Sequence, residues 1–289
     1  MMAELVLAVA LQASPPSTAR PAVRATAPKP VPTRASKAAS AAQKPKRSIA
    51  RVVIDAGHGG VDPGAPIMTK GNVREKDIAL QVALKVGNAL KLKGIDVVYT
   101  RTKDTLIALA DRGHIANQAD GDVFISIHVN AANQNWKNPG SARGFETFFL
   151  AEARTEDARR VEAMENESMR FETGPSRDSS DPLSVILRDM EQNQYLRESA
   201  DFADVMQRGL GRVHPGPDRG VKQAGFNVLV TALMPAILIE LGFGTNSVEA
   251  AYLASPARQG NLARVIADAT AEYLQRYQRR VGEPLGSHE

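Results

Sequence analysis

The sequence predicts an α/β protein of three layers, in which a twisted, mostly parallel mixed sheet of about six strands is flanked by helices. Short runs of β-branched residues alternate with segments whose apolar residues recur at helical spacing. The composition, 43% hydrophobic and 24% charged, is that of an ordinary globular protein. The part that follows residue 48 is about 230 residues long, which suits one domain with one continuous core.

The first half of the predicted domain alternates strand and helix. Residues 51–55 form a β-branched run that ends in a glycine-rich loop at 57–60. Apolar residues at helical spacing predict a helix over 78–92, which Gly94 ends. The next predicted elements are a strand over 95–100, a helix over 106–118, and strands over 123–128 and 144–150. This order favours parallel strands that are joined by helices.

The second half contains one unusually long connection. Residues 226–230 and 236–240 predict two further strands, and 256–279 predict a closing helix. Before them lies a charged, mostly helical stretch, 152–218. Because it is far longer than a typical connection, we expect an additional helical layer or a functional insertion. We therefore predict one domain over 49–281 that carries this insertion.

Both ends of the chain differ in composition from this domain. Residues 5–13 form a short apolar run of the kind found in secretory signals, although Glu4 before it is acidic. We interpret 1–13 as the remnant of a signal and expect an exported protein of the periplasm or cell envelope. Residues 14–48 are rich in Ala, Pro and Lys and predict a disordered, basic linker, because they cannot bury enough apolar surface to offset chain entropy. Residues 282–289 are expected to form a tail.

The charge distribution argues against a nucleic-acid partner. Residues 1–50 carry a formal charge of +7 and the remainder carries −3, so the overall +4 belongs to the N-terminal segment and not to a groove in the domain. The sequence has no cysteine, which excludes a disulfide framework, cysteine-ligated zinc and a catalytic thiol. No run approaches the roughly 18 apolar residues that a transmembrane helix needs.

Four polar residues are expected to meet at one edge of the sheet, where the carboxyl ends of parallel strands gather. His58 follows the first strand, His128 closes a second one and Glu240 closes a third. Glu75 lies at the start of the helix after the first strand, so that connection brings it near His58. Two histidines and one carboxylate with an open fourth position form the ligand set of a catalytic zinc ion.

We predict that His58, Glu75 and His128 bind Zn²⁺, which lowers the pKa of a bound water to roughly 7. Glu240 is the expected base, which takes the proton of that water and passes it to a leaving nitrogen. Asp55 or backbone carbonyls are expected to orient the imidazoles. Structural roles stay open at this point: a histidine at a strand end often makes only hydrogen bonds, and Glu75 also suits the dipole of a first helical turn.

Seven segments together resemble a known family. They are 54–65 (IDAGHGGVDPGA), 74–77 (REKD), 99–101 (YTR), 109–112 (LADR), 122–131 (DVFISIHVNA), 220–226 (GVKQAGF) and 239–246 (IELGFGTN). The family is that of the zinc-dependent N-acetylmuramoyl-L-alanine amidases of the cell-separation type. The resemblance implies that His58, Glu75 and His128 bind zinc and that Glu240 is the catalytic base. It also implies the substrate, the amide between N-acetylmuramic acid and the first L-alanine of the peptidoglycan stem peptide.

The stretch 152–218 resembles the helical insertion with which division-type members plug their active site. Glu165 best matches the residue that enters the open zinc position, and 183–210 resembles the helix that docks a protein activator. The resemblance therefore implies autoinhibition, with peptidoglycan as substrate and an activator as partner; we expect a monomer. Leu241 and Thr245 depart from the family, where Thr and Ser are frequent, but neither is a ligand.

Two other functions stay open at the level of the sequence. One is a zinc peptidase that acts on the stem peptide, which would trim or split peptides in place of freeing them from glycan. The other is a catalytically silent wall-binding regulator that kept the fold. The presence of all four site residues argues against the second.

Overall fold

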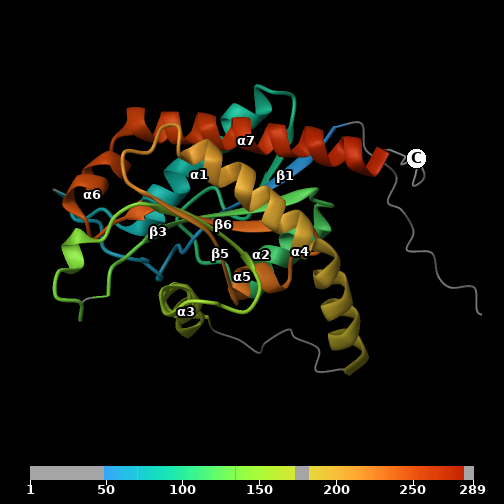
Figure 1. The fold of residues 1–289 in the computed structure, drawn as a ribbon, viewed down its shortest axis with the longest axis horizontal. Coiled ribbons are helices and arrows are strands. Elements are labelled where there is room, and N and C mark those ends of the chain that lie inside the picture. The colour runs from blue at the N-terminus through green and yellow to red at the C-terminus, as the bar shows by residue number, and fades with distance from the viewer. Residues whose placement is uncertain (1–48, 70, 134, 173–181, 283–289) are drawn as a thin grey trace, which may run out of the picture. The chain divides into compact units, whose positions relative to one another are not determined.

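The computed structural model describes residues 49–69, 71–133, 135–172 and 182–282. Its centre is a six-stranded sheet in the order β2-β1-β3-β6-β4-β5, with helices on both faces (Figure 1). This confirms the predicted fold class of a three-layer α/β domain. The expectations for 1–13 and 14–48 and for the tail after residue 282 lie outside the described residues. Among the described helices, none is long and apolar enough to cross a membrane.

The strands and helices follow the predicted alternation. The strands are β1 (Arg51–Ala56), β2 (Asp96–Tyr99), β3 (Val123–Asn130), β4 (Phe145–Leu150), β5 (Asp218–Ala224) and β6 (Ala236–Phe243). The α-helices are α1 (Glu75–Lys91), α2 (Leu109–Gln118), α3 (Glu156–Asn166), α4 (Pro182–Leu210), α5 (Asn227–Val230), α6 (Ser247–Leu253) and α7 (Pro256–Gly282). Two short 3₁₀ helices, η1 (Pro139–Ser141) and η2 (Glu167–Phe171), complete the described elements.

The sheet is mixed because one strand pair reverses direction. The pairs β2-β1, β1-β3, β3-β6 and β4-β5 are parallel, whereas β4 and β6 are antiparallel. As a result, the start of β4 lies at the edge where β3 and β6 end, and Glu146 stands opposite Glu240. Every residue of β3 and β6 is buried, as expected for central strands covered on both faces.

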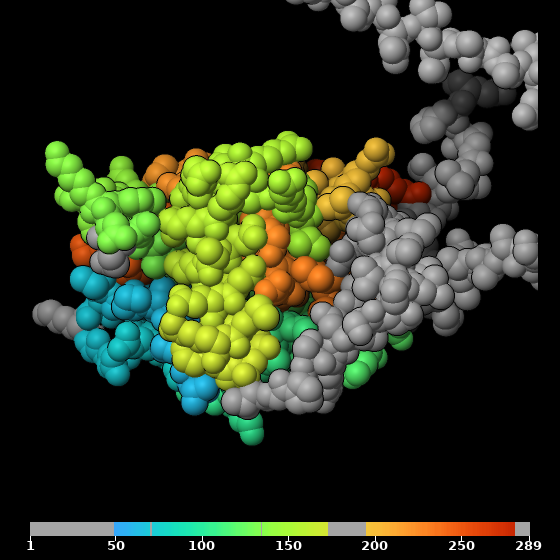
Figure 2. Space-filling model, turned by 90° about the horizontal axis from the view of Figure 1, so that it is seen from below, coloured from blue at the N-terminus to red at the C-terminus, as the bar shows by residue number. Residues whose placement is uncertain are grey.

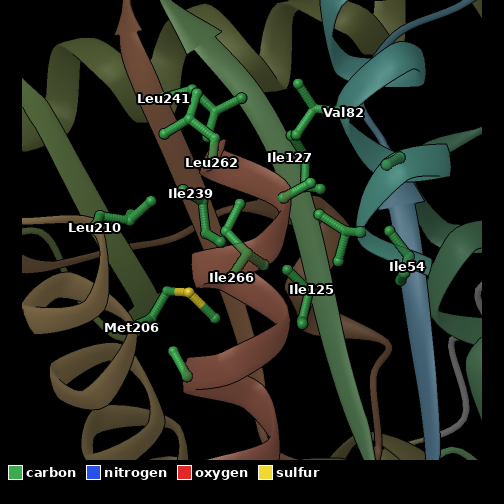
Figure 3. Close-up of a cluster of buried hydrophobic side chains, with 14 of the residues drawn as sticks. Ile54, Val82, Ile125, Ile127, Met206, Leu210, Ile239, Leu241, Leu262 and Ile266 are labelled. Atoms are coloured by element: carbon green, nitrogen blue, oxygen red, sulfur yellow. The ribbon is translucent and has the colours of Figure 1, made fainter. Parts of the chain in front are cut away.

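Two hydrophobic cores, one on each face of the sheet, hold the layers together, in place of the single continuous core that was expected. The larger core lies between the sheet and helices α1, α4 and α7; Figure 3 shows Ile125, Ile239 and Ile266 packed in it. The smaller core covers the opposite face with residues of α2, α3 and α5. Each fully buried isoleucine or leucine contributes roughly 1.5–3 kcal/mol. The two cores fix the strand ends from which the polar site residues extend.

The structure corrects one strand assignment. The predicted strand over 226–230 is wrong: these residues form α5, and the edge strand is β5, which lies upstream. Phe226, Val228 and Leu229 are buried in the smaller core, and so short an apolar run does not distinguish helix from strand. The residues of β5 are mostly polar and half-buried, which hid the strand in the sequence.

The stretch 152–218 is only partly an addition to the domain. Its first helix, α3, packs against β5 and η2, as an insertion would. The last part of α4, however, places Phe202, Met206 and Leu210 in the larger core (Figure 3). That part is integral to the fold and is not an extra layer.

A buried ion pair supports the carboxyl end of β1. The carboxylate of Asp55 accepts hydrogen bonds from the hydroxyls of Thr100 (2.6 Å) and Ser126 (2.6 Å) and pairs with Arg112 Nη1 at 3.0 Å. Burial alone would raise the pKa of Asp55, but Arg112 and the two hydroxyls hold it below its usual value. The carboxylate is therefore charged at neutral pH and joins β1, β3, α2 and the end of β2.

Arg112→Met is expected to destabilise the fold strongly, because it leaves the Asp55 carboxylate buried without its cation. Breaking a buried pair in this way costs about 3–5 kcal/mol, which equilibrium urea unfolding would measure. The control is Arg264→Met, which removes an exposed pair with Asp268 at 3.4 Å; such pairs contribute less than about 1 kcal/mol. Equal losses in the two variants would contradict the role assigned to Arg112.

Candidate metal centre

Four buried side chains from separate elements converge beyond the carboxyl end of the sheet. They are His58, Glu75, His128 and Glu165, and each offers one ligand atom within 4.8 Å of the others. His58 lies in the loop after β1, Glu75 begins α1, His128 lies on β3 and Glu165 lies near the end of α3. The three residues predicted to bind zinc thus meet, and the residue predicted to plug the site stands among them.

The separations between these donor atoms suit a small tetrahedral ion. Nε2 of His58 lies 3.1 Å from Oε1 of Glu75 and 3.2 Å from Oε2 of Glu165. Nδ1 of His128 lies 3.2 Å and 2.7 Å from the same two oxygens. Donors at zinc distances of about 2.0–2.1 Å in a tetrahedron are about 3.3 Å apart. Three of the four separations lie within about 0.2 Å of this spacing and the fourth is shorter, so the donor set suits a small divalent cation.

Several of these atoms have no hydrogen-bond partner in the described part of the chain. Nε2 of His58 and both carboxylate oxygens of Glu165 are buried and lack one, although they lie at ion-pair distance from each other. Buried polar atoms without partners are costly. A divalent cation would satisfy them, which is a second reason to assign a metal to this position.

The electrostatics of the cluster also favour a cation. Burial alone would lower the pKa of His58, but Glu75 and Glu165 raise it well above its usual value. In the same way Glu165 outweighs burial and raises the pKa of His128 to about 10. Burial would raise the pKa of Glu75, and the two imidazoles lower it instead. An imidazole that binds a metal ion is neutral. Cation binding must therefore release the protons that the neighbouring carboxylates stabilise on His58 and His128.

An acidic side chain orients His58. Oδ2 of Asp62 lies 2.8 Å from Nδ1 of His58, so Nε2 faces the other donors. Ser168 Oγ in η2 lies 3.3 Å from the same nitrogen. The expected partner, Asp55, lies on β1 and pairs with Arg112 instead. Sequence reasoning missed Asp62, whose signal was its position four residues after His58 in a tight turn closed by Gly59.

Two arginines fix the backbone that presents His58. Arg101 donates to the carbonyls of Ala56 (2.9 Å) and Gly57 (2.7 Å). Arg112 donates to the carbonyls of Ala56 (2.9 Å) and His58 (3.0 Å). These bonds hold His58 at φ 58°, a left-handed conformation that costs a non-glycine residue roughly 1–2 kcal/mol. The hydrogen bonds from the two guanidinium groups to three consecutive carbonyls offset this backbone strain.

Glu75 is held by the backbone. Its Oε2 accepts the amide of Ala65 (2.7 Å) and its Oε1 accepts the amide of Val129 (2.8 Å). The second bond ties α1 to the residue that follows His128. Glu75 is thus more than a favourable charge in a first helical turn, because both oxygens are placed by specific donors.

The candidate base stands beside the cluster. Glu240 lies on β6 and is paired with His128 on β3 and with Glu146 on β4. It is fully buried, and its two oxygens lack hydrogen-bond partners among the described residues. Burial, and then the Glu165 carboxylate, raise the pKa of Glu240 well above its usual value. The prediction that Glu240 closes its strand is wrong, since β6 continues to Phe243.

Comparison with known proteins adds to this geometry. The profile of the family Amidase_3, described as N-acetylmuramoyl-L-alanine amidase, matches residues 52–272. The amidase AmiA of Escherichia coli strain K12 is 32% identical over 225 residues, which are 77% of this chain and 75% of AmiA. AmiC of Neisseria meningitidis serogroup B is also 32% identical, over 77% of this chain and 52% of AmiC.

Two solved structures of N-acetylmuramoyl-L-alanine amidases are also similar to this chain. An N-acetylmuramoyl-L-alanine amidase from Clostridium difficile 630 is 32% identical with a TM-score of 0.59, covering 79% of this chain and 98% of that one. The catalytic domain of CwlV, an amidase from Bacillus (Paenibacillus) polymyxa var. colistinus, is 29% identical with a TM-score of 0.57, over 78% and 99% of the two chains.

Gly57→Ala is expected to displace a metal ligand without unfolding the protein. A Cβ at this position would lie 2.5–2.8 Å from Cε1, Nε2 and Nδ1 of His128. We expect zinc affinity to fall at least about tenfold, by analogy with the loss of groups that orient ligands. Metal analysis after dialysis measures this, and circular dichroism checks the fold. Gly260→Ala, where a Cβ meets no atom within 4 Å, is the control; unchanged zinc content in Gly57→Ala would contradict the assigned centre.

Proposed function

This chain belongs to the N-acetylmuramoyl-L-alanine amidases, and from that premise we propose that it is a zinc-dependent peptidoglycan amidase of daughter-cell separation whose own insertion inhibits it. The observation that carries the proposal is the meeting of His58, Glu75, His128 and Glu165 in one buried donor set. In this proposal the first three hold zinc, and the bond cleaved joins N-acetylmuramic acid to the first L-alanine of the stem peptide. Export to the periplasm or cell envelope, and a monomeric state, complete it.

The chemistry is divided between the ion and Glu240. A bound zinc ion would supply Lewis acidity, which lowers the pKa of water and polarises the scissile carbonyl. Glu240 takes the proton of the attacking water on a carboxylate oxygen and delivers it to the leaving nitrogen of L-alanine. Asp62 and Glu75 keep their positions through the bonds described above, and Arg101 and Arg112 hold the loop of His58.

The inhibitory part of the proposal rests on the position of Glu165. Catalytic zinc sites keep one ligand position open, and Glu165 is the fourth donor of this set, only 4% exposed. Figure 2 shows the segment of α3 and η2, in yellow-green, on the face of the molecule that is seen from below in Figure 1. Substrate can enter only when α3 moves away. The proposed activator binds the predicted docking helix 183–210, which corresponds to α4.

Full-length protein loaded with zinc is expected to release intact stem peptides from purified sacculi. Glu240→Gln should lower this rate by about 10²–10⁴-fold, the usual loss of a general base, and should retain zinc. Mass spectrometry of the products and metal analysis are the measurements. Trimmed or split peptides with the muramoyl–alanine bond intact would instead indicate a stem-peptide peptidase. Zinc binding without any cleavage, by Glu165→Ala protein as well as by wild type, would indicate a silent regulator.

Glu165→Ala is expected to raise the basal rate of sacculus hydrolysis. A hydrogen bond or ligand contact to a charged group contributes about 1.5–3 kcal/mol, so its loss should raise the rate by at least about tenfold. Glu156→Ala removes an exposed carboxylate of the same helix, which pairs with Arg159, and is the control. The plug assignment fails if dye release from labelled sacculi is the same for Glu165→Ala and wild type.

A further inference from the structure

A second charged cluster lies one strand away from the candidate base. Glu146, fully buried on β4 opposite Glu240, accepts Arg219 Nε at 3.0 Å and Lys222 Nζ at 2.5 Å. Its other oxygen accepts the side-chain amide of Asn130 at 2.6 Å. Arg219 and Lys222, which we call the β5 cation pair, therefore border the proposed active site.

The cation pair holds a carboxylate of the insertion. Oδ2 of Asp157 lies 2.6 Å from Arg219 Nη2 and 2.7 Å from Lys222 Nζ. Arg160 adds a contact of 3.2 Å to the other oxygen of Asp157. Burial would raise the pKa of Asp157, but Lys222, Arg219 and Arg160 lower it to about 2. Asp157 is thus a charged, tightly bound anion on α3.

Asp157 and Glu165 lie on the same face of α3. They are eight residues apart, with the fully buried Val161 midway between them. At 1.5 Å per residue, their separation along the helix is roughly 12 Å. One helix therefore places one carboxylate among the metal ligands and another on the cation pair.

The cation pair also has contacts outside α3. Arg219 lies over the ring of Phe243 at 5.0 Å and Lys222 over the ring of Phe148 at 5.9 Å. Both also keep Glu146, which belongs to the sheet. When α3 moves away, two cations face the opened site with one carboxylate between them. This leaves one positive charge without a partner, at a place only partly open to solvent.

We propose that Arg219 and Lys222 form the subsite that binds a carboxylate of the stem peptide, and that Asp157 occupies this subsite in the substrate's place. The inference rests on the proposed amidase function. Extended peptide covers about 3.3–3.6 Å per residue, so a distance of roughly 12 Å corresponds to a carboxylate about three residues beyond the scissile amide. An arginine and a lysine together suit such a group, since charge-assisted bonds to carboxylate are short and strong.

The test compares two synthetic N-acetylmuramoyl-tripeptides that differ only in charge. One carries free carboxylates on its second and third residues, and the other carries carboxamides there. Calorimetry with the full-length, zinc-loaded double variant Glu165→Ala/Glu240→Gln, in which the proposed plug is weakened, measures binding without turnover. We expect the carboxylate peptide to bind at least about tenfold more tightly, which corresponds to about 1.4 kcal/mol. Lys222→Met in this background should abolish the preference by weakening only the carboxylate peptide.

Two further variants separate recognition from a structural tether. Asp157→Asn should tighten binding of the carboxylate peptide and keep the preference, because it removes the competing anion. Lys93→Met, which removes a remote pair with Asp268 at 2.5 Å, should change neither affinity. Three results would refute the subsite. They are equal affinities for the two peptides when Arg219 and Lys222 are intact, a preference for the carboxylate peptide that survives Lys222→Met, and a preference that is lost in Asp157→Asn.

The same peptides distinguish failure of this inference from failure of the proposed function. Glu165→Ala protein with Glu240 intact, in which the proposed plug is weakened, is incubated with both, and the products are identified by mass spectrometry. Cleavage between muramic acid and L-alanine without a binding preference refutes the subsite and leaves the amidase function standing. A binding preference without cleavage at that bond refutes the function and leaves the carboxylate subsite standing.

Discussion

The buried pair of Asp55 and Arg112 is the interaction on which the candidate metal centre depends. Arg112 joins the Asp55 carboxylate of β1 to the carbonyls of Ala56 and His58. It thereby fixes the left-handed conformation of His58, which a non-glycine residue would otherwise avoid. Burying two charges is expensive, and the pair is tolerated because hydroxyls and carbonyls complete its hydrogen bonds. The candidate metal ligand His58, which lies on a loop, acquires in this way the rigidity of the sheet.

The sequence allowed prediction of the fold class and of where His58, Glu75, His128 and Glu240 lie, because each is close to the end of an element whose apolar pattern is clear. It did not allow prediction of β5, an edge strand whose polar residues carry no alternation. Asp62 escaped notice because its contact arises from a tight turn and not from periodicity. The proximity of Glu165 followed only from family resemblance, since no local pattern places an insertion over a site.

The insertion combines polar and apolar attachment. Ala158 and Val161 of α3 belong to the smaller core, where Phe148 and Phe226 also lie. Displacing α3 would therefore expose apolar surface as well as break ion pairs, and a partner that covers that surface would lower the cost of release. The final part of α4 stays in the larger core, so such a movement need not disturb the sheet.

The two carboxylates of α3 give its attachment the character of a bivalent ligand. While one end is bound, the other is held near its own site at a high effective concentration, which strengthens double engagement by on the order of 10²–10⁴ over either contact alone. When a competitor takes the binding site of one carboxylate, α3 loses this gain in affinity at both sites. In the proposed autoinhibition, release of α3 is consequently expected to be steep in the concentration of the displacing molecule, and a helix of eleven residues can serve as a threshold element.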